Sequence, residues 1–383
     1  MTACAIETAV RDGGPTWPAP AGQGAFTITA NGAYAARLAG SGDARYVERW
    51  TLDGPEPYAV PLPLGQPEEP GTRPLPLADG RVLVARRVDG RRHTFSLLYP
   101  TGPGTGELLL GAVDAPGSEH LVLLPPSPDG IRAYALCVGP DTSTLWLVAG
   151  GAFGPERVAE VRGHCSGGVW LDRTGRMLAL DRRLGDGPVK AVAVDLERGG
   201  EVTPLLQITE HSHDRLLLAD PDSGLLLIRS DAPSPGHDRL GWGVLGSLLP
   251  VRFPDCLRLD DAAVTPFAVQ PGQTLLPEGC GVALRIDAAA GSWVGMWRPS
   301  SRRMRQLAVP AGWLAGAGLW TPEGVLRLPY ATPGAPCGLA ALEEPDEPPV
   351  PEPAAAATGT GAFKVCRPVP LQQAPLTDRG PAR

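Results

Sequence analysis

One short phrase recurs along the chain: a polar turn that ends in glycine and separates two apolar runs. The glycines that end these turns are Gly32, Gly80, Gly130, Gly175, Gly224, Gly272 and Gly324. Successive glycines lie 45 to 52 residues apart, so the period is nearly constant from one end of the chain to the other. A fixed period of this length predicts a repeat architecture in which each repeat is one supersecondary unit.

The repeated units contain short β-type runs and no helical pattern. In the third unit, Leu121–Leu124 precedes the turn, and Ile131–Val138, Ser143–Val148 and Arg157–Val161 follow it. Apolar residues do not recur at the i, i+3, i+4 spacing of an amphipathic helix. Four short antiparallel strands within about 50 residues are typical of a propeller blade. We therefore predict an all-β, seven-bladed β-propeller of four-stranded antiparallel blades.

The third unit also carries a family resemblance. Leu123–Leu136 (LLPPSPDGIRAYAL) followed by Thr144–Val148 (TLWLV) resembles the repeat of TolB-type and prolyl-oligopeptidase-type propellers, which are WD40-like. A degenerate copy occurs in the second unit, as Leu77–Gly80 with Phe95–Tyr99. The resemblance extends over residues 24–342 and implies the fold. It implies little about function, because this architecture hosts binding modules, lyases and hydrolase lids alike.

Three segments are expected. Residues 1–342 form the propeller, and residues 343–361 are acidic and rich in proline and alanine, which predicts an extended linker. Residues 362–383 regain apolar side chains and contain one β-capable run, Phe363–Cys366. This last segment is expected either to return to the ring as a strand or to dock on a partner as a short peptide.

Closure of the ring requires an outer strand that the seventh unit lacks. That unit supplies only three β-type runs before the proline-rich stretch begins. Cys4–Val10 and Phe363–Cys366 are the two candidates for the missing strand. We favour Cys4–Val10, because the connection through residues 11–23 is shorter than the connection through the linker.

Charge and composition argue against several classes of partner. The net charge is −7, the pI is near 5.5, and no basic stripe is present, so nucleic acid is not an expected partner. No apolar stretch is long enough to span a membrane, and the first residues do not resemble a secretion signal. The cysteines number seven, and no two of them form a C-x-x-C pair. We expect a cytoplasmic monomer with reduced thiols and no membrane insertion.

Motifs for catalysis and cofactors are missing from the sequence. It contains neither the G-x-S-x-G of a serine hydrolase nor a phosphate-binding glycine loop, so no catalytic residue and no cofactor are predicted. The best candidate for metal binding is His211 and His213, since residues i and i+2 of an extended chain share one side. His237 or Asp238 could supply a third ligand.

Two tryptophans are candidates for a binding surface. Trp242 and Trp313 follow glycines and could be exposed anchors on a face of the ring, whereas most tryptophans are expected between blades. The leading functional hypothesis is a non-catalytic propeller that binds a protein or peptide partner through its mouth or blade edges. The alternative is a propeller lyase or hydrolase with a metal funnel lined by histidines.

Overall fold

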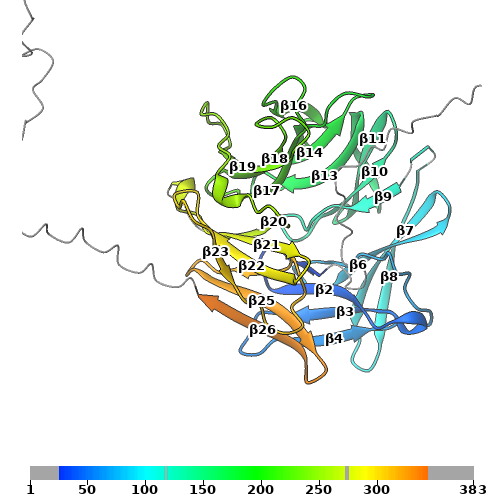
Figure 1. The fold of residues 1–383 in the computed structure, drawn as a ribbon. Helices are drawn as coiled ribbons and strands as arrows, with labels where there is room; N and C mark the ends of the chain where they lie inside the picture. The colour runs from blue at the N-terminus through cyan, green and yellow to red at the C-terminus, as the bar shows by residue number, and fades with distance from the viewer. Residues whose placement is uncertain (1–25, 116, 119, 272–275, 344–383) are drawn as a thin grey trace, which may run out of the picture. The chain divides into compact units, whose positions relative to one another are not determined.

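The structure is a computed structural model that describes residues 26–115, 117–118, 120–271 and 276–343. These residues are almost entirely β-strands, arranged as a β-propeller (Figure 1). Three single-turn 3₁₀ helices interrupt the described strands, at Gly42–Ala44, Asp255–Leu257 and Pro277–Gly279. The expected all-β propeller fold is confirmed.

The described strands follow one another in seven groups along the chain. Group 1 contains β1 (Thr27–Ile28), β2 (Tyr34–Ala39), β3 (Tyr46–Thr51) and β4 (Tyr58–Leu62), and group 2 contains β5 (Leu75–Pro76), β6 (Val82–Asp89), β7 (Arg92–Pro100) and β8 (Thr105–Asp114). Group 3 contains β9 (His120–Leu123), β10 (Ala133–Val138), β11 (Thr142–Ala149) and β12 (Glu156–Arg162), and group 4 contains β13 (His164–Trp170), β14 (Met177–Arg183), β15 (Lys190–Asp195) and β16 (Glu201–Leu206). Group 5 contains β17 (Asp214–Ala219), β18 (Leu225–Ser230) and β19 (Arg239–Val244), and group 6 contains β20 (Ala262–Val269), β21 (Val282–Ala288), β22 (Gly291–Trp297) and β23 (Arg305–Leu307). Group 7 contains β24 (Leu319–Trp320), β25 (Val325–Thr332) and β26 (Ala335–Glu343).

The number of separate sheets differs from the prediction of seven four-stranded blades. Within the described residues, only five sheets have four strands or more, and a sixth sheet has three. One of the five has seven strands, because a parallel bridge between Lys190 of β15 and Asp214 of β17 joins groups 4 and 5. The repeated glycine turns indicate how many units the sequence contains. They do not indicate which hydrogen bonds join two neighbouring units into one sheet.

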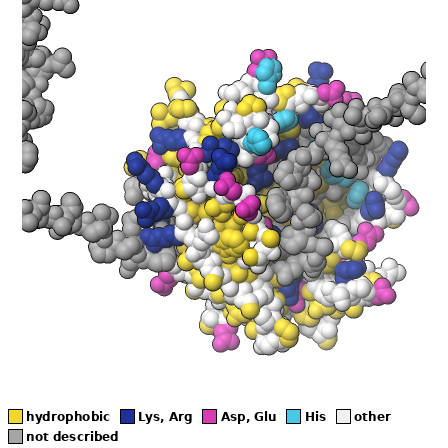
Figure 2. All heavy atoms as spheres, in the orientation of Figure 1, with side chains coloured by type: hydrophobic (Ala, Val, Ile, Leu, Met, Phe, Trp, Pro, Cys, Tyr) yellow, Lys and Arg dark blue, Asp and Glu magenta, His cyan; other side chains and the backbone are white. Residues whose placement is uncertain are grey.

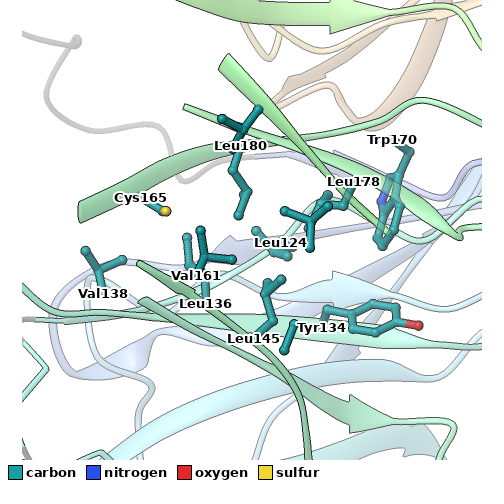
Figure 3. Close-up of a cluster of buried hydrophobic side chains, with 13 residues drawn as sticks. Leu124, Tyr134, Leu136, Val138, Leu145, Val161, Cys165, Trp170, Leu178 and Leu180 are labelled. Carbon is teal, nitrogen blue, oxygen red and sulfur yellow. The ribbon is translucent and has the colours of Figure 1, made fainter. Parts of the chain in front are cut away.

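The hydrophobic core is divided among the junctions between successive groups. The cluster in Figure 3 joins group 3 to group 4, with Leu136 and Leu145 packed against Leu178 and Leu180. Further clusters join each of the other neighbouring pairs of groups, and one of them joins group 7 to group 1 through Leu314, Leu339 and Trp50. A group alone exposes both faces of its sheet, so its stability depends on its neighbours.

The glycine turns link the first two strands of each group. Where the structure describes them, these glycines have positive φ values between 70° and 91°, a conformation that glycine adopts without steric cost. Gly272 lies outside the described residues. In several turns a side-chain oxygen accepts backbone N–H groups, as Asp129 Oδ1 does from Ile131 and Arg132.

Each of these turns also contacts the turn region of the neighbouring group. The Ala78 N–H donates to the Gly130 carbonyl at 2.9 Å, and the Gln270 side chain donates to the Pro322 carbonyl at 3.0 Å. Tyr34 lies against Gly80, Ser127 against Gly175, Leu319 against Gly32, Arg173 against Asp222, and Ser223 against Cys280. The turns therefore form a continuous belt around one end of the ring, which we call the turn rim.

The predicted ends of the propeller fall largely outside the described residues. Strand β26 ends at Glu343, one residue inside the predicted linker 343–361. Both candidates for the closing strand, Cys4–Val10 and Phe363–Cys366, and the segment 362–383 lie beyond the described part of the chain.

Candidate functional site

The structure describes all four residues that are candidates for metal binding. His211, His213, His237 and Asp238 are all exposed. Nδ1 of His213 accepts a hydrogen bond from the Val189 N–H at 3.2 Å, which occupies one of its two ring nitrogens. Among the described residues, no group of three or more His, Cys, Asp or Glu side chains could hold a metal ion.

The same stretch of sequence instead supplies a buried carboxylate. Between the exposed histidines, Ser212 and Asp214 face the interior, and Asp214 is 0% exposed. Its carboxylate accepts hydrogen bonds from Ser212 Oγ at 2.9 Å, Ser230 Oγ at 2.6 Å and the Ile208 N–H at 2.9 Å. A buried charge requires both hydrogen bonds and a counter-charge.

Lys190 supplies that counter-charge. Its Nζ lies 2.7 Å from Oδ2 of Asp214 and also donates to the Thr209 carbonyl at 2.5 Å. Lys190 and Asp214 are the two residues that bridge groups 4 and 5, so the ion pair lies where the two sheets fuse. We assign this cluster a structural role, because it links group 4 to group 5.

A second buried carboxylate lies near a glycine bulge in β13. Asp181 is buried, and the loss of solvent raises the pKa of its carboxyl to about 6. The Leu216 N–H donates to Oδ1 at 3.0 Å, and Arg215 Nη1 lies 3.7 Å from Oδ2, and both lower the pKa against this effect. Asp181 thus connects group 4 to group 5 at a second point.

The two tryptophans proposed as exposed anchors are buried. Trp313 packs against Phe267, with ring centroids 5.8 Å apart, and its Nε1 donates to the Ala317 carbonyl at 3.0 Å. Trp242 is covered by Arg252, whose guanidinium carbon lies 4.9 Å from the ring centroid. Neither ring is an exposed anchor, although Trp242 does line a shallow pocket at the surface.

An apolar surface lies directly beside that pocket. The loop 245–250 (LGSLLP) follows β19, and the Leu245 N–H donates to the carbonyl of Gly224 on the turn rim. Leu248 is fully exposed and Leu249 is 65% exposed. We call this segment the leucine loop. Figure 2 shows hydrophobic side chains at the tip of the loop drawn beside β19.

Polar and apolar residues surround the leucine loop. Leu249 and Pro250 line the shallow pocket together with Trp242, Arg252 and Glu278. Leu276, which precedes Glu278 by two residues, is also strongly exposed. Apolar side chains around an aromatic floor with charged residues at the edge are typical of protein interaction sites.

Comparisons with known proteins agree with the fold and go no further. No family model matches the sequence, and no curated protein matches it either. Among solved structures, a prolyl endopeptidase, from a study of two such enzymes, matches with a TM-score of 0.51 and 15% identity. Prolyl oligopeptidase B from Galerina marginata matches with a TM-score of 0.51 and 10% identity. The shared feature is the propeller fold.

The chain spans only about half the length of the two peptidases it matches. The chain is covered over 84% and 82% of its length but spans only 46% and 45% of those peptidase chains. TolB from Acinetobacter baumannii is also similar, with a TM-score of 0.42, 11% identity, and coverage of 81% of this chain and 79% of that one. At such identities the likeness to the peptidases concerns architecture alone.

Two further observations concern the cysteines and the possibility of a membrane-spanning helix. Cys137, Cys165, Cys256, Cys280 and Cys337 are free thiols, and burial raises the pKa of Cys137 to about 11. In the part of the chain that the structure describes, no helix is long and apolar enough to cross a membrane.

Proposed function

We propose that the protein is a non-catalytic binding module whose leucine loop docks an aliphatic segment of another protein. The observation that carries the proposal is the exposure of Leu248 and Leu249 at the tip of a loop on the turn rim. Adjacent leucines that remain exposed in the isolated chain lose unfavourable contact with water when a partner covers them.

The chemistry of the surrounding residues supports a protein partner. Trp242 and Pro250 give the surface a rigid floor, and Arg252 and Glu278 provide polar contacts at its edge. Interfaces concentrate their binding energy in a few apolar and aromatic side chains inside such a polar rim. The free thiols fit a reducing, cytoplasmic setting, which we include in the proposal.

The test compares two pairs of adjacent leucines. Leu248 and Leu249 are changed to Asp in one variant, and Leu108 and Leu109 of β8 are changed to Asp in the control. Leu109 is 65% exposed, the same as Leu249, and Leu108 is 46% exposed, whereas Leu248 is fully exposed. The control therefore adds the same charge to a second exposed leucine pair on the surface. Proteins from a native extract that bind wild type are quantified on each variant by mass spectrometry, and the strongest is then purified.

The expected result is a partner whose affinity falls at least about thirtyfold in the leucine-loop variant, since hot-spot residues cost about 2 kcal/mol or more. Its affinity for the Leu108 and Leu109 variant should stay within about twofold of wild type. A partner that binds wild type and both variants equally would disprove docking at the leucine loop.

A further inference from the structure

A pocket of about 480 Å³ opens at the end of group 4 that faces away from the turn rim. Strand β14 begins after the fourth glycine turn and ends at Arg183, so the pocket beside its end belongs to the opposite rim. The walls come from the β14–β15 hairpin and from the segment that follows β16. The volume is in the range of small-molecule and peptide sites.

Two cations line this pocket, and one of them is fully engaged. Lys190 donates to Asp214 Oδ2, to the Thr209 carbonyl and to Ser212 Oγ, the last at 3.3 Å. These three acceptors match the three protons of its ammonium group. Lys190 therefore has no donor left for a ligand.

Arg182 is the other cation of the pocket, and it is half-buried. Within the described residues, its guanidinium has no hydrogen bond and no ion pair. A guanidinium presents parallel N–H groups that match the two oxygens of a carboxylate. The Arg182 guanidinium is partly removed from water and has no protein partner among these residues in compensation, so it is expected to bind an anion.

The remaining walls restrict which anion fits. Leu184, Pro188 and Ile208 make one side aliphatic, and Glu210 places a negative charge at the edge. Glu210 also has no hydrogen bond or ion pair among the described residues. A phosphate or dicarboxylate would bring a second negative charge toward Glu210, whereas a single carboxylate on an aliphatic group would not.

We propose that this pocket binds a monocarboxylate attached to an aliphatic group, with Arg182 as the residue that pairs with the carboxylate. Two sources share this chemistry: the C-terminal end of a peptide with an aliphatic last residue, and a free aliphatic acid. The pocket and the leucine loop lie at opposite rims, so this site does not depend on the proposed function.

The experiment measures binding of small probes to the full chain by isothermal titration calorimetry. N-acetyl-leucine represents a peptide C-terminus, hexanoate represents a free aliphatic acid, and N-acetyl-leucinamide lacks the carboxylate. We expect wild type to bind at least one acid about tenfold or more tightly than the amide, since hydrogen bonds to charged groups have this magnitude. The acid that binds more tightly identifies the source.

Variants locate the site. Arg182→Gln should weaken binding of the preferred acid about tenfold or more, and Arg182→Lys should fall between it and wild type. Arg183→Gln is the matched control, because Arg183 is the next residue and does not line the pocket. Glu210→Gln should strengthen binding of succinate more than binding of the monocarboxylate.

Several results would overturn the inference. They are the absence of saturable binding by either acid, equal affinity for N-acetyl-leucine and its amide, and unchanged affinity in a folded Arg182→Gln protein. A thermal scan of each variant establishes folding. If Arg182→Gln does not fold, the Arg182→Lys and Glu210→Gln variants decide the question by the same comparisons.

Discussion

The buried ion pair between groups 4 and 5 predicts a large effect of one substitution. Lys190→Met keeps most of the aliphatic stem and removes the ammonium group 2.7 Å from Asp214. The carboxylate would then remain 0% exposed, with hydroxyl and N–H donors but without a counter-charge. Breaking a buried pair in this way lowers the free energy of unfolding by about 3–5 kcal/mol.

This energy corresponds to a measurable change in melting temperature. The unfolding entropy is about 2.1 cal/mol/K per residue, or about 0.7 kcal/mol/K for the roughly 320 residues between residues 26 and 343. A loss of 3–5 kcal/mol therefore lowers the melting temperature by about 4–7 °C. The change is expected in both thermal scans and guanidinium titrations.

A double-mutant cycle separates the pair from its surroundings. Asp214→Asn in the Lys190→Met background removes the uncompensated charge, so the double variant should be more stable than Lys190→Met alone. Arg157→Met is the control, because Arg157 pairs with Glu160 at 3.1 Å on the exposed surface, where such pairs contribute about 0.2–1 kcal/mol. A Lys190→Met protein no less stable than Arg157→Met would refute the reasoning.

Three further predictions follow from other parts of the chain. Gly130→Ala should destabilise the protein more than Gly246→Ala. Both glycines have positive φ, but only at Gly130 would an added Cβ meet a neighbouring atom, Cβ of Ala78 at 2.5 Å. Denaturant titration of the two variants measures the difference in stability. Asp181→Asn should raise the free energy of unfolding by up to about 3 kcal/mol at pH 7.5 and have little effect at pH 4. The reason is that Asp181 has a pKa of about 6 in the folded protein, so its ionisation destabilises the fold as the pH rises from 4 to 6. A stability change that is the same at both pH values would contradict this. Deletion of residues 1–10 should lower the melting temperature by several degrees and deletion of 344–383 should not, whereas the reverse order would assign closure to the tail.

The turns and the fold could be predicted from the sequence because they depend on local chemistry. A glycine after a polar residue marks a tight turn wherever it occurs, and Gly80 and Gly175 have the expected positive φ. The fusion of groups 4 and 5 could not be predicted, since it depends on one parallel bridge between residues 24 positions apart. The contacts between successive turns likewise depend on the closed ring.

The candidate sites were harder to predict, and the reasons differ. The alternation of the stretch from residue 211 to 214 is visible in the sequence, but the sequence does not show that the buried pair, Ser212 and Asp214, has the structural role. The metal site at the two exposed histidines stays a prediction. Lys190 stands out in the sequence as one of only two lysines among 34 basic residues, but its pairing with Asp214 depends on the contact between groups 4 and 5. The exposure of Leu248 could not be inferred, because a leucine after a strand is usually buried.

The turn rim has a consequence for how the molecule tolerates insertions. Because each turn touches the next, as Ala78 touches Gly130, a residue inserted into one turn would displace its neighbours around the belt. The tip of the β14–β15 hairpin, at the other end, is open by comparison: at Gly185 an added Cβ would meet nothing within 4 Å. The tip of this hairpin can therefore lengthen without displacing a neighbour, which makes it a suitable place to graft a foreign peptide or to change ligand preference without rebuilding the propeller.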